Sequence, residues 1–83
     1  MKFEPNNIKV KAGEVTFEVK NVGVTDHNFV FEEKGGQSPG RIPVVETGKA
    51  EQLKVSLSPG SYPFYCSLPG HKDAGMVGTV IAE

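Results

Sequence analysis

The sequence contains a single cysteine, Cys66, so no disulfide can form within the chain and the cysteine count does not indicate a redox compartment. No apolar run approaches the roughly 20 residues that a membrane-spanning helix requires. No basic run favours nucleic-acid binding, and no acidic tail indicates a disordered arm. Nine basic and ten acidic residues are scattered along the chain and give a net charge of −1. These absences argue against a membrane-spanning protein and a nucleic-acid-binding protein.

The chain also lacks internal repeats, low-complexity segments and linkers. With 83 residues, we expect one domain over residues 1–83. A domain of this size buries only a modest core and often gains stability from a bound metal. No signal peptide is visible, so export would require that a leader had been removed.

Ten glycines and six prolines separate short apolar runs, and no stretch of ten residues has a helical period. Alternation of apolar and polar residues predicts strands, because strand side chains change face at every residue. The expected strands are Met1–Glu4, Ile8–Lys11, Val15–Lys20, Asp26–Glu32, Glu51–Leu57, Tyr62–Cys66 and Val77–Ala82. About seven short strands at these intervals favour an all-β, two-sheet sandwich.

Two of these strands carry residues with metal-binding side chains on an inward face. Alternation places His27 on the same face as Phe29 and Phe31, and Cys66 on the same face as Phe64. The polar stretch Glu33–Thr47, rich in glycine and proline, is expected to be mostly loop.

Cys66, His71 and Met76 have the spacing Cys-x4-His-x4-Met in a turn-rich loop, and the second histidine, His27, lies far upstream. One thiolate, two imidazoles and one thioether form the donor set that redox-active copper prefers, with the thioether as a weak axial ligand. Taken singly, each residue has an ordinary structural explanation in a core or a solvated loop. Their joint occurrence in this register predicts copper ligation.

The motifs Phe64–His71 and Ala74–Gly78, together with His27-Asn28, resemble those of the cupredoxins, and most closely the plastocyanin-like small blue copper proteins. The resemblance covers about the last twenty residues strongly and the remainder only in strand pattern. It implies a Greek-key β-sandwich, one type 1 copper ion cycling between Cu(I) and Cu(II), and electron transfer without catalysis.

The resemblance also implies roles for particular residues. The copper ligands would be His27, Cys66, His71 and Met76. Asn28 would hydrogen-bond near the sulfur, with Ser67 as its partner. Tyr62 resembles a structural tyrosine of the family, and Tyr65 its outward aromatic beside the cysteine.

The partners implied are larger redox proteins, such as cytochromes, oxidases or photosynthetic complexes. They would dock transiently on a monomer near His71, on an apolar surface made by Leu68, Pro69 and Val24. A periplasmic or otherwise exported location is expected.

The sequence departs from plant plastocyanins at several points. Four residues separate Cys66 from His71 where those proteins have two, and Asp26 replaces the proline before the first histidine. The chain is shorter, and the acidic docking patches are absent. Because loop length affects the exposure of His71 and the reduction potential, neither property carries over from those proteins.

Three other functions fit these residues less well. Copper storage or delivery is disfavoured by a closed four-ligand site, because delivery needs exchangeable ligands. Structural zinc is disfavoured because methionine is a poor zinc ligand. An enzyme is disfavoured because four protein ligands leave no open position, although a fragment of a multicopper oxidase or nitrite reductase would carry a similar domain.

Overall fold

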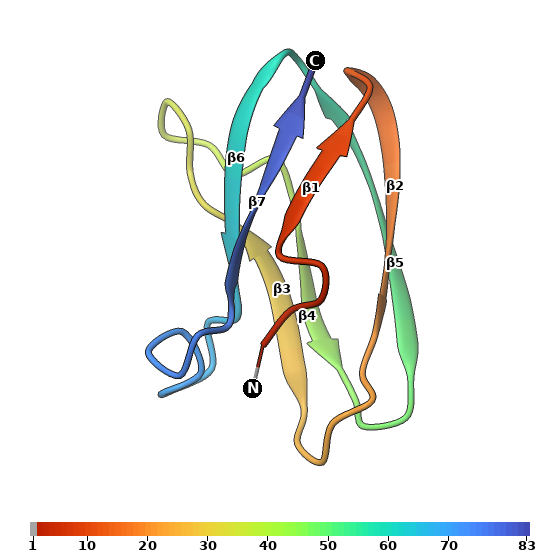
Figure 1. The fold of residues 1–83 in the computed structure, drawn as a ribbon, viewed down its shortest axis with the longest axis vertical. Helices are drawn as coiled ribbons and strands as arrows, with labels where there is room; N and C mark the ends of the chain where they lie inside the picture. The colour runs from red at the N-terminus through yellow and green to blue at the C-terminus, as the bar shows by residue number, and fades with distance from the viewer. Residues whose placement is uncertain (1) are drawn as a thin grey trace.

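The computed structural model describes residues 2–83, which form seven strands in two sheets (Figure 1). The five-stranded sheet has the order β1 (Asn7–Val10), β7 (Val77–Ala82), β6 (Gly60–Tyr65), β3 (His27–Phe31) and β4 (Arg41–Val45). The two-stranded sheet pairs β2 (Gly13–Lys20) with β5 (Ala50–Leu57). β1 runs parallel to β7, and the other paired strands are antiparallel. The predicted Greek-key β-sandwich is confirmed. Within residues 2–83, no helix is long and apolar enough to cross a membrane.

The strand pair β2–β5 follows the alternation of the sequence directly. Val15 lies opposite Val55, and Phe17 lies opposite Leu53, so the apolar residues of both strands fall on one face. Phe17 and Val55 are buried there, whereas Thr16 between them is exposed. This face covers the inner side of the five-stranded sheet.

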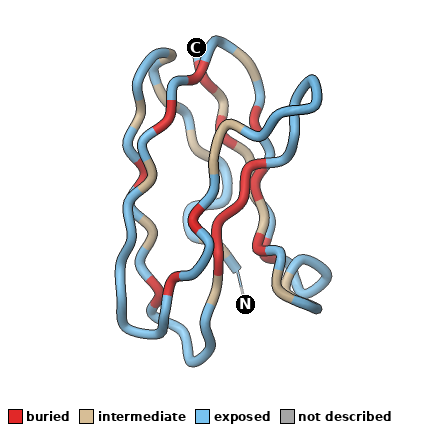
Figure 2. Tube along the Cα trace, turned by 180° about the vertical axis from the view of Figure 1, so that it is seen from behind, coloured by how far each residue is buried: buried red, intermediate tan, exposed pale blue. Residues whose placement is uncertain are grey.

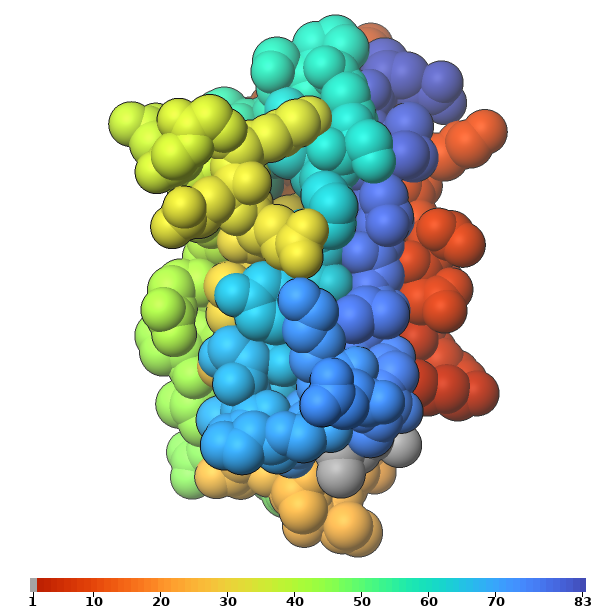
Figure 3. Space-filling model, turned by 90° about the vertical axis from the view of Figure 1, so that its left-hand side faces the viewer, coloured from red at the N-terminus to blue at the C-terminus, as the bar shows by residue number. Residues whose placement is uncertain are grey.

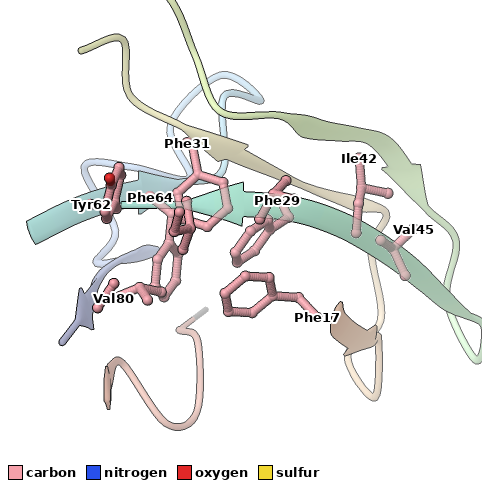
Figure 4. Packing of buried hydrophobic residues seen from close by; sticks show 11 residues of the cluster. Phe17, Phe29, Phe31, Ile42, Val45, Tyr62, Phe64 and Val80 are labelled. Atoms are coloured by element: carbon pink, nitrogen blue, oxygen red, sulfur yellow. The ribbon is translucent and has the colours of Figure 1, made fainter. Parts of the chain in front are cut away.

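The core lies between the sheets and is built mainly from aromatic rings (Figure 4). Phe29 stacks on Phe64 with ring centroids 4.7 Å apart, and Phe31 meets Phe29 edge-on at 5.1 Å. Phe17 of the other sheet contacts Phe31 at 5.5 Å. Figure 2 shows the buried positions following the strands, with the loops exposed at both ends. Because β3 and β6 carry most of these rings, the two strands that lead to the candidate ligands are rigidly held.

The prediction that Glu33–Thr47 is mostly loop is wrong over Arg41–Val45, which forms the edge strand β4. The register between β3 and β4 shifts, so that three residues of β4 advance while β3 advances two. The extra residue leaves Pro43 and Val44 both exposed between two buried neighbours. Such a bulge breaks the period of two on which the prediction relied, and it accommodates a proline that a regular inner strand would not.

The predicted strand Met1–Glu4 is also wrong where it can be compared. Met1 lies outside the described residues, and residues 2–4 are not in a strand. Phe3 nevertheless packs inward as expected, with its ring 5.1 Å from that of Phe64 and 5.7 Å from that of Phe29. The segment is therefore anchored through one side chain rather than through backbone pairing.

Candidate metal centre

Three strand ends meet at the lower end of the sandwich in Figure 1. β3 begins at His27, β6 ends one residue before Cys66, and β7 begins one residue after Met76. β6 runs antiparallel to both β3 and β7. Tyr65 at the end of β6 pairs with Val77 at the start of β7 and with Val30 of β3, so the first residues of β3 extend past the end of β6 toward the segment that follows it. The loop between β6 and β7, which contains His71, lies on the lower part of the face turned to the viewer in Figure 3, above the loop that precedes β3.

The structure brings together three of the four predicted ligand residues through their side-chain donor atoms. His27 Nδ1 lies 3.0 Å from His71 Nδ1, and Cys66 Sγ lies 3.4 Å from the same His71 atom. All three donor atoms lie within 4.8 Å of one another. Cys66 is completely buried, and both histidines are half-buried. The two imidazole rings are therefore partly accessible to solvent, whereas the sulfur of Cys66 is not.

Met76, the fourth predicted ligand, is hydrogen-bonded through its main chain to the main chains of Cys66 and His71. Its carbonyl accepts a hydrogen bond from Cys66 N at 3.1 Å, and its N–H donates to the carbonyl of His71 at 3.0 Å. The residue is 3% exposed, so its side chain is buried at this end of the core. Both ends of the loop are thus closed by hydrogen bonds between candidate ligand residues.

A tight turn sets the position of His71. His71 N donates to the carbonyl of Leu68 at 3.1 Å, and Gly70 at the third position has a φ of 79°. Pro69 before it supplies the fixed φ of the second position, so the turn has the sequence preference of a type II turn. Ala74 N then donates to the carbonyl of Gly70 at 3.0 Å and continues the hydrogen-bonded loop. The turn and this bond therefore restrict the conformation of the loop around His71.

Asn28 ties the start of β3 to the end of β6. Its Nδ2 donates to Ser67 Oγ at 2.7 Å, and its Oδ1 accepts from Ser67 N at 2.7 Å. Its main-chain N–H points to Cys66 Sγ at 3.4 Å. The expected pairing of Asn28 with Ser67 is confirmed, and it places a hydrogen-bond donor on the sulfur, which favours the thiolate.

The two imidazoles face each other through their Nδ1 atoms. At 3.0 Å, one Nδ1–H donates to the lone pair of the other Nδ1, which requires at least one uncharged ring. Burial, and then the neighbouring His71, lower the pKa of His27 below its ordinary value. The neutral form favoured in this way is the form that binds metal ions.

The chemistry of this donor set fits a soft metal ion. Three ligands around one ion, with bonds of about 2.0–2.3 Å, lie about 3.5–4 Å apart if they are trigonal. The observed separations of 3.0 and 3.4 Å are close to that spacing. Among residues 2–83, His27, Cys66 and His71 form the group of three or more His, Cys, Asp or Glu side chains that lie close enough to share one metal ion. Asp26 does not join it, because its exposed carboxylate accepts a hydrogen bond from Thr47 N at 3.4 Å.

Lys72 makes an ion pair and a cation–π contact outside the site, and neither was predicted from the sequence. Lys72 Nζ lies 4.7 Å above the centroid of the Tyr65 ring and 3.5 Å from a carboxylate oxygen of Glu32. The loop is therefore fastened across the outer face of β6. Glu32 is the last residue of the predicted strand Asp26–Glu32, and no local sequence pattern connects it with a lysine forty residues later.

Asn21 was also missed. Its sequence context, Asn-Val-Gly, indicated only a turn, but the side chain is 5% exposed and lies next to the turn that leads to His27. A buried asparagine cannot be recognised from a turn motif alone, because turn asparagines are commonly solvated. On the same loop, Val22 and Val24 are each 94% exposed.

Comparisons with known proteins agree with this geometry. A family profile described as "Copper binding proteins, plastocyanin/azurin family" matches residues 1–83. The chain is 44% identical over 84 residues to a chloroplastic plastocyanin of Hordeum vulgare, covering 94% of this chain and 52% of that protein. It is 32% identical over 100 residues to a copper-resistant cuproprotein, CopI, of Rubrivivax gelatinosus, covering all of this chain and 61% of that protein. The chain thus spans about half the length of the plastocyanin precursor it matches.

Solved structures show the same fold. The auracyanin of Roseiflexus castenholzii superposes with a TM-score of 0.86 at 20% identity, over 96% of this chain and 86% of that chain. A reduced amicyanin variant superposes with a TM-score of 0.78 at 26% identity, over the whole of this chain and 74% of that chain.

Proposed function

The chain belongs to the plastocyanin/azurin family of copper-binding proteins, and on that basis we propose that it is a small carrier of single electrons. Its cofactor is one type 1 copper ion, for which we propose His27, Cys66, His71 and Met76 as ligands. The observation that carries the proposal is the convergence of one thiol and two imidazole nitrogens within 4.8 Å at the end of a rigid sandwich. When bound, copper supplies a one-electron couple between Cu(I) and Cu(II).

The protein's own contribution is to hold the donors still. The turn before His71, the main-chain bonds of Met76 and the Asn28–Ser67 pair restrict the ligand loop at its middle and at both ends. Little then has to move when an electron arrives or leaves. The N–H of Asn28 on the sulfur of Cys66 stabilises its negative charge in either oxidation state.

A carrier fits the site better than an enzyme or a delivery protein. Four protein ligands leave no position for a substrate, whereas catalytic metal sites keep one open. Delivery favours exposed ligands that exchange readily, but Cys66 is completely buried and Met76 is 3% exposed. Rapid, complete transfer of copper to a weak chelator would favour the delivery function instead.

Electron exchange would pass through His71, the half-buried ligand on the surface loop. Half-buried Leu68 and exposed Pro69 belong to the turn that ends at His71, and Val24 is 94% exposed on the loop that leads to His27. We assign this apolar surface to the transient docking of a larger redox protein. Leu68→Glu should slow electron exchange with a cognate partner while leaving the copper spectrum intact. Unchanged exchange would refute the docking surface.

We further propose that residues 1–83 act as one monomeric domain, exported to the periplasm or an equivalent compartment. The similar plastocyanin of Hordeum vulgare is chloroplastic, so that relative is transported out of the compartment in which it is made, and this supports export here. Cell fractionation of the native protein tests the location, and sedimentation of the copper-loaded protein tests the monomer. Recovery in the cytosolic fraction, or a stable dimer, would contradict these assignments.

Copper addition to the metal-free protein tests the main proposal. An intense blue or green colour from thiolate-to-copper charge transfer is expected at one copper per chain, and Cys66→Ser should abolish it because the thiolate supplies the absorption. A colourless wild-type protein that holds stoichiometric Cu(II) would defeat the proposal. Metal analysis of protein from its native source separates copper from zinc, since zinc uptake during recombinant expression reflects availability.

A further inference from the structure

The loop that leads into β3 is closed by the buried side chain of Asn21. Its Nδ2 donates to the carbonyl of Thr25 at 2.7 Å and to that of Val45 at 2.8 Å, and its Oδ1 accepts from Gly23 N at 2.9 Å. Its main chain pairs with the turn after β4, through Asn21 N to Lys49 O at 2.9 Å and Gly48 N to Asn21 O at 2.8 Å. The side-chain amide thus uses both donor hydrogens and its acceptor oxygen.

Polar contacts, rather than apolar packing, hold this loop. Val22 and Val24, which flank Gly23, are each 94% exposed and contribute almost no buried surface. The loop therefore depends on the three hydrogen bonds of the Asn21 side chain for its shape. A buried amide left without these partners would be costly, so the closed form is strongly preferred over an open one.

The closed loop lies next to Nε2 of His27, the ring nitrogen that does not face His71. A Cβ built on Gly23 would lie 3.4 Å from His27 Nε2 and 3.3 Å from Asn21 Oδ1. His27 Nδ1, the other ring nitrogen, faces His71. Val45, whose carbonyl binds Asn21, is also the residue that pairs with His27 across β3 and β4. Asn21 therefore reaches His27 by two routes, through Gly23 and through the edge strand.

We propose that Asn21 is a positioning residue for the metal centre, holding Gly23 against the Nε2 edge of His27 so that Nδ1 stays directed at His71 and Cys66. The inference about the loaded protein rests on the proposed copper site. The inference about the ring itself holds for the metal-free protein and is tested there independently.

Asn21→Ala removes all three side-chain bonds, and Tyr62→Phe is the matched control. Tyr62 is buried and its hydroxyl donates to the carbonyl of Ser58 at 2.8 Å, near the start of β6 and away from the ligand loop. Both variants lose buried hydrogen bonds, so both should lower the melting temperature. Only Asn21→Ala should disturb the position of His27.

In the metal-free protein, nuclear Overhauser contacts between the His27 ring protons and the Gly23 α-protons report the position of the ring. These contacts should be lost in Asn21→Ala and retained in Tyr62→Phe. In the copper-loaded protein, transfer of Cu(II) to a chelator should be about tenfold faster or more in Asn21→Ala, the usual effect of removing an outer support of a metal ligand. Tyr62→Phe should release copper at the wild-type rate.

Gly23→Ala decides the matter if Asn21→Ala does not fold. The φ of Gly23 is not in the left-handed region, so alanine fits the backbone. The added methyl would crowd Asn21 Oδ1 at 3.3 Å and would come into contact with His27 Nε2 at 3.4 Å. The His27 ring resonances should shift while the melting temperature stays near that of the wild type. Unchanged His27 resonances in Gly23→Ala would overturn the proposal, as would retained contacts and wild-type copper release in Asn21→Ala. If no coloured copper site forms in the wild type, the proposed function fails, but the metal-free measurements still test the placement of His27.

Discussion

Replacement of Asn28 by alanine tests whether one side chain holds the ligand loop to the sandwich. The substitution removes two hydrogen bonds of 2.7 Å, both to Ser67, from a residue that is 3% exposed. Each bond contributes about 1 kcal/mol net. The main-chain N–H of Ser67 also loses its acceptor, which adds up to about 1 kcal/mol; the cost stays this small because Ser67 is exposed and water replaces part of the lost bond. The expected loss is therefore about 2–3 kcal/mol, a large share of the roughly 4–12 kcal/mol available to a domain of this size.

Calorimetry of the metal-free protein measures this loss without interference from metal binding. For a chain of 60–100 residues, a loss of about 2–3 kcal/mol lowers the melting temperature by roughly 10–20 °C. Ser67→Ala is the matched partial variant, because it removes the bond to Asn28 Nδ2 and keeps the main-chain bond to Asn28 Oδ1. It should cost about 1 kcal/mol.

The two single variants and the double variant form a thermodynamic cycle that isolates the bond between the side chains. A coupling energy of about 0.5–1.5 kcal/mol is expected for residues in direct contact. A melting temperature of Asn28→Ala within about 2 °C of the wild type would refute the reasoning, since that difference corresponds to less than one hydrogen bond. Zero coupling would show that the side-chain bond between Asn28 and Ser67 contributes nothing in solution.

Three further predictions concern the core, the axial ligand and acid stability. Gly78→Ala should lower the urea midpoint by the equivalent of about 1–3 kcal/mol, because the new Cβ would overlap the ring of Phe64 and lie 2.7 Å from the carbonyl of Asn6; an unchanged midpoint would show that this packing is loose. Met76→Leu should keep the colour and raise the reduction potential measured by voltammetry, and an unchanged or lower potential would contradict Met76 as axial ligand. The lowered pKa of His27 means that the unfolded chain binds its proton first, so its contribution to metal-free stability is complete above about pH 6.5 and is lost as the pH falls through the folded pKa. Urea unfolding at several pH values should show this decline in the wild type and a weaker one in His27→Gln; identical profiles would refute it.

The sequence determined most strands, because their side chains alternate without interruption. The bounds of every strand except β4 were predicted within one or two residues of those observed, which covers β1, β2, β3, β5, β6 and β7. β4 escaped prediction because its bulge places Pro43 and Val44 together on the exposed side. A bulge is defined by the partner strand, so a single strand's pattern cannot reveal it.

Three of the four candidate ligands could also be identified from the segment Cys66–Met76 alone. Cys66, His71 and Met76 lie within eleven residues, and a turn with Pro69 and Gly70 brings them together by local geometry. The pairing of Asn28 with Ser67 could be anticipated only through resemblance to a family.

Only the tertiary structure decided how His27 is held and how the loop is fastened from outside. The bond from Asn21 to the carbonyl of Val45 joins residues 24 apart, and the contact of Lys72 with Glu32 joins the loop between β6 and β7 to the residue that follows β3. Residue type alone gives no partner to a turn asparagine or to a surface lysine. The partners exist because the sandwich brings the ends of β3, β4 and β6 to one place, and that placement depends on the packing of the whole core.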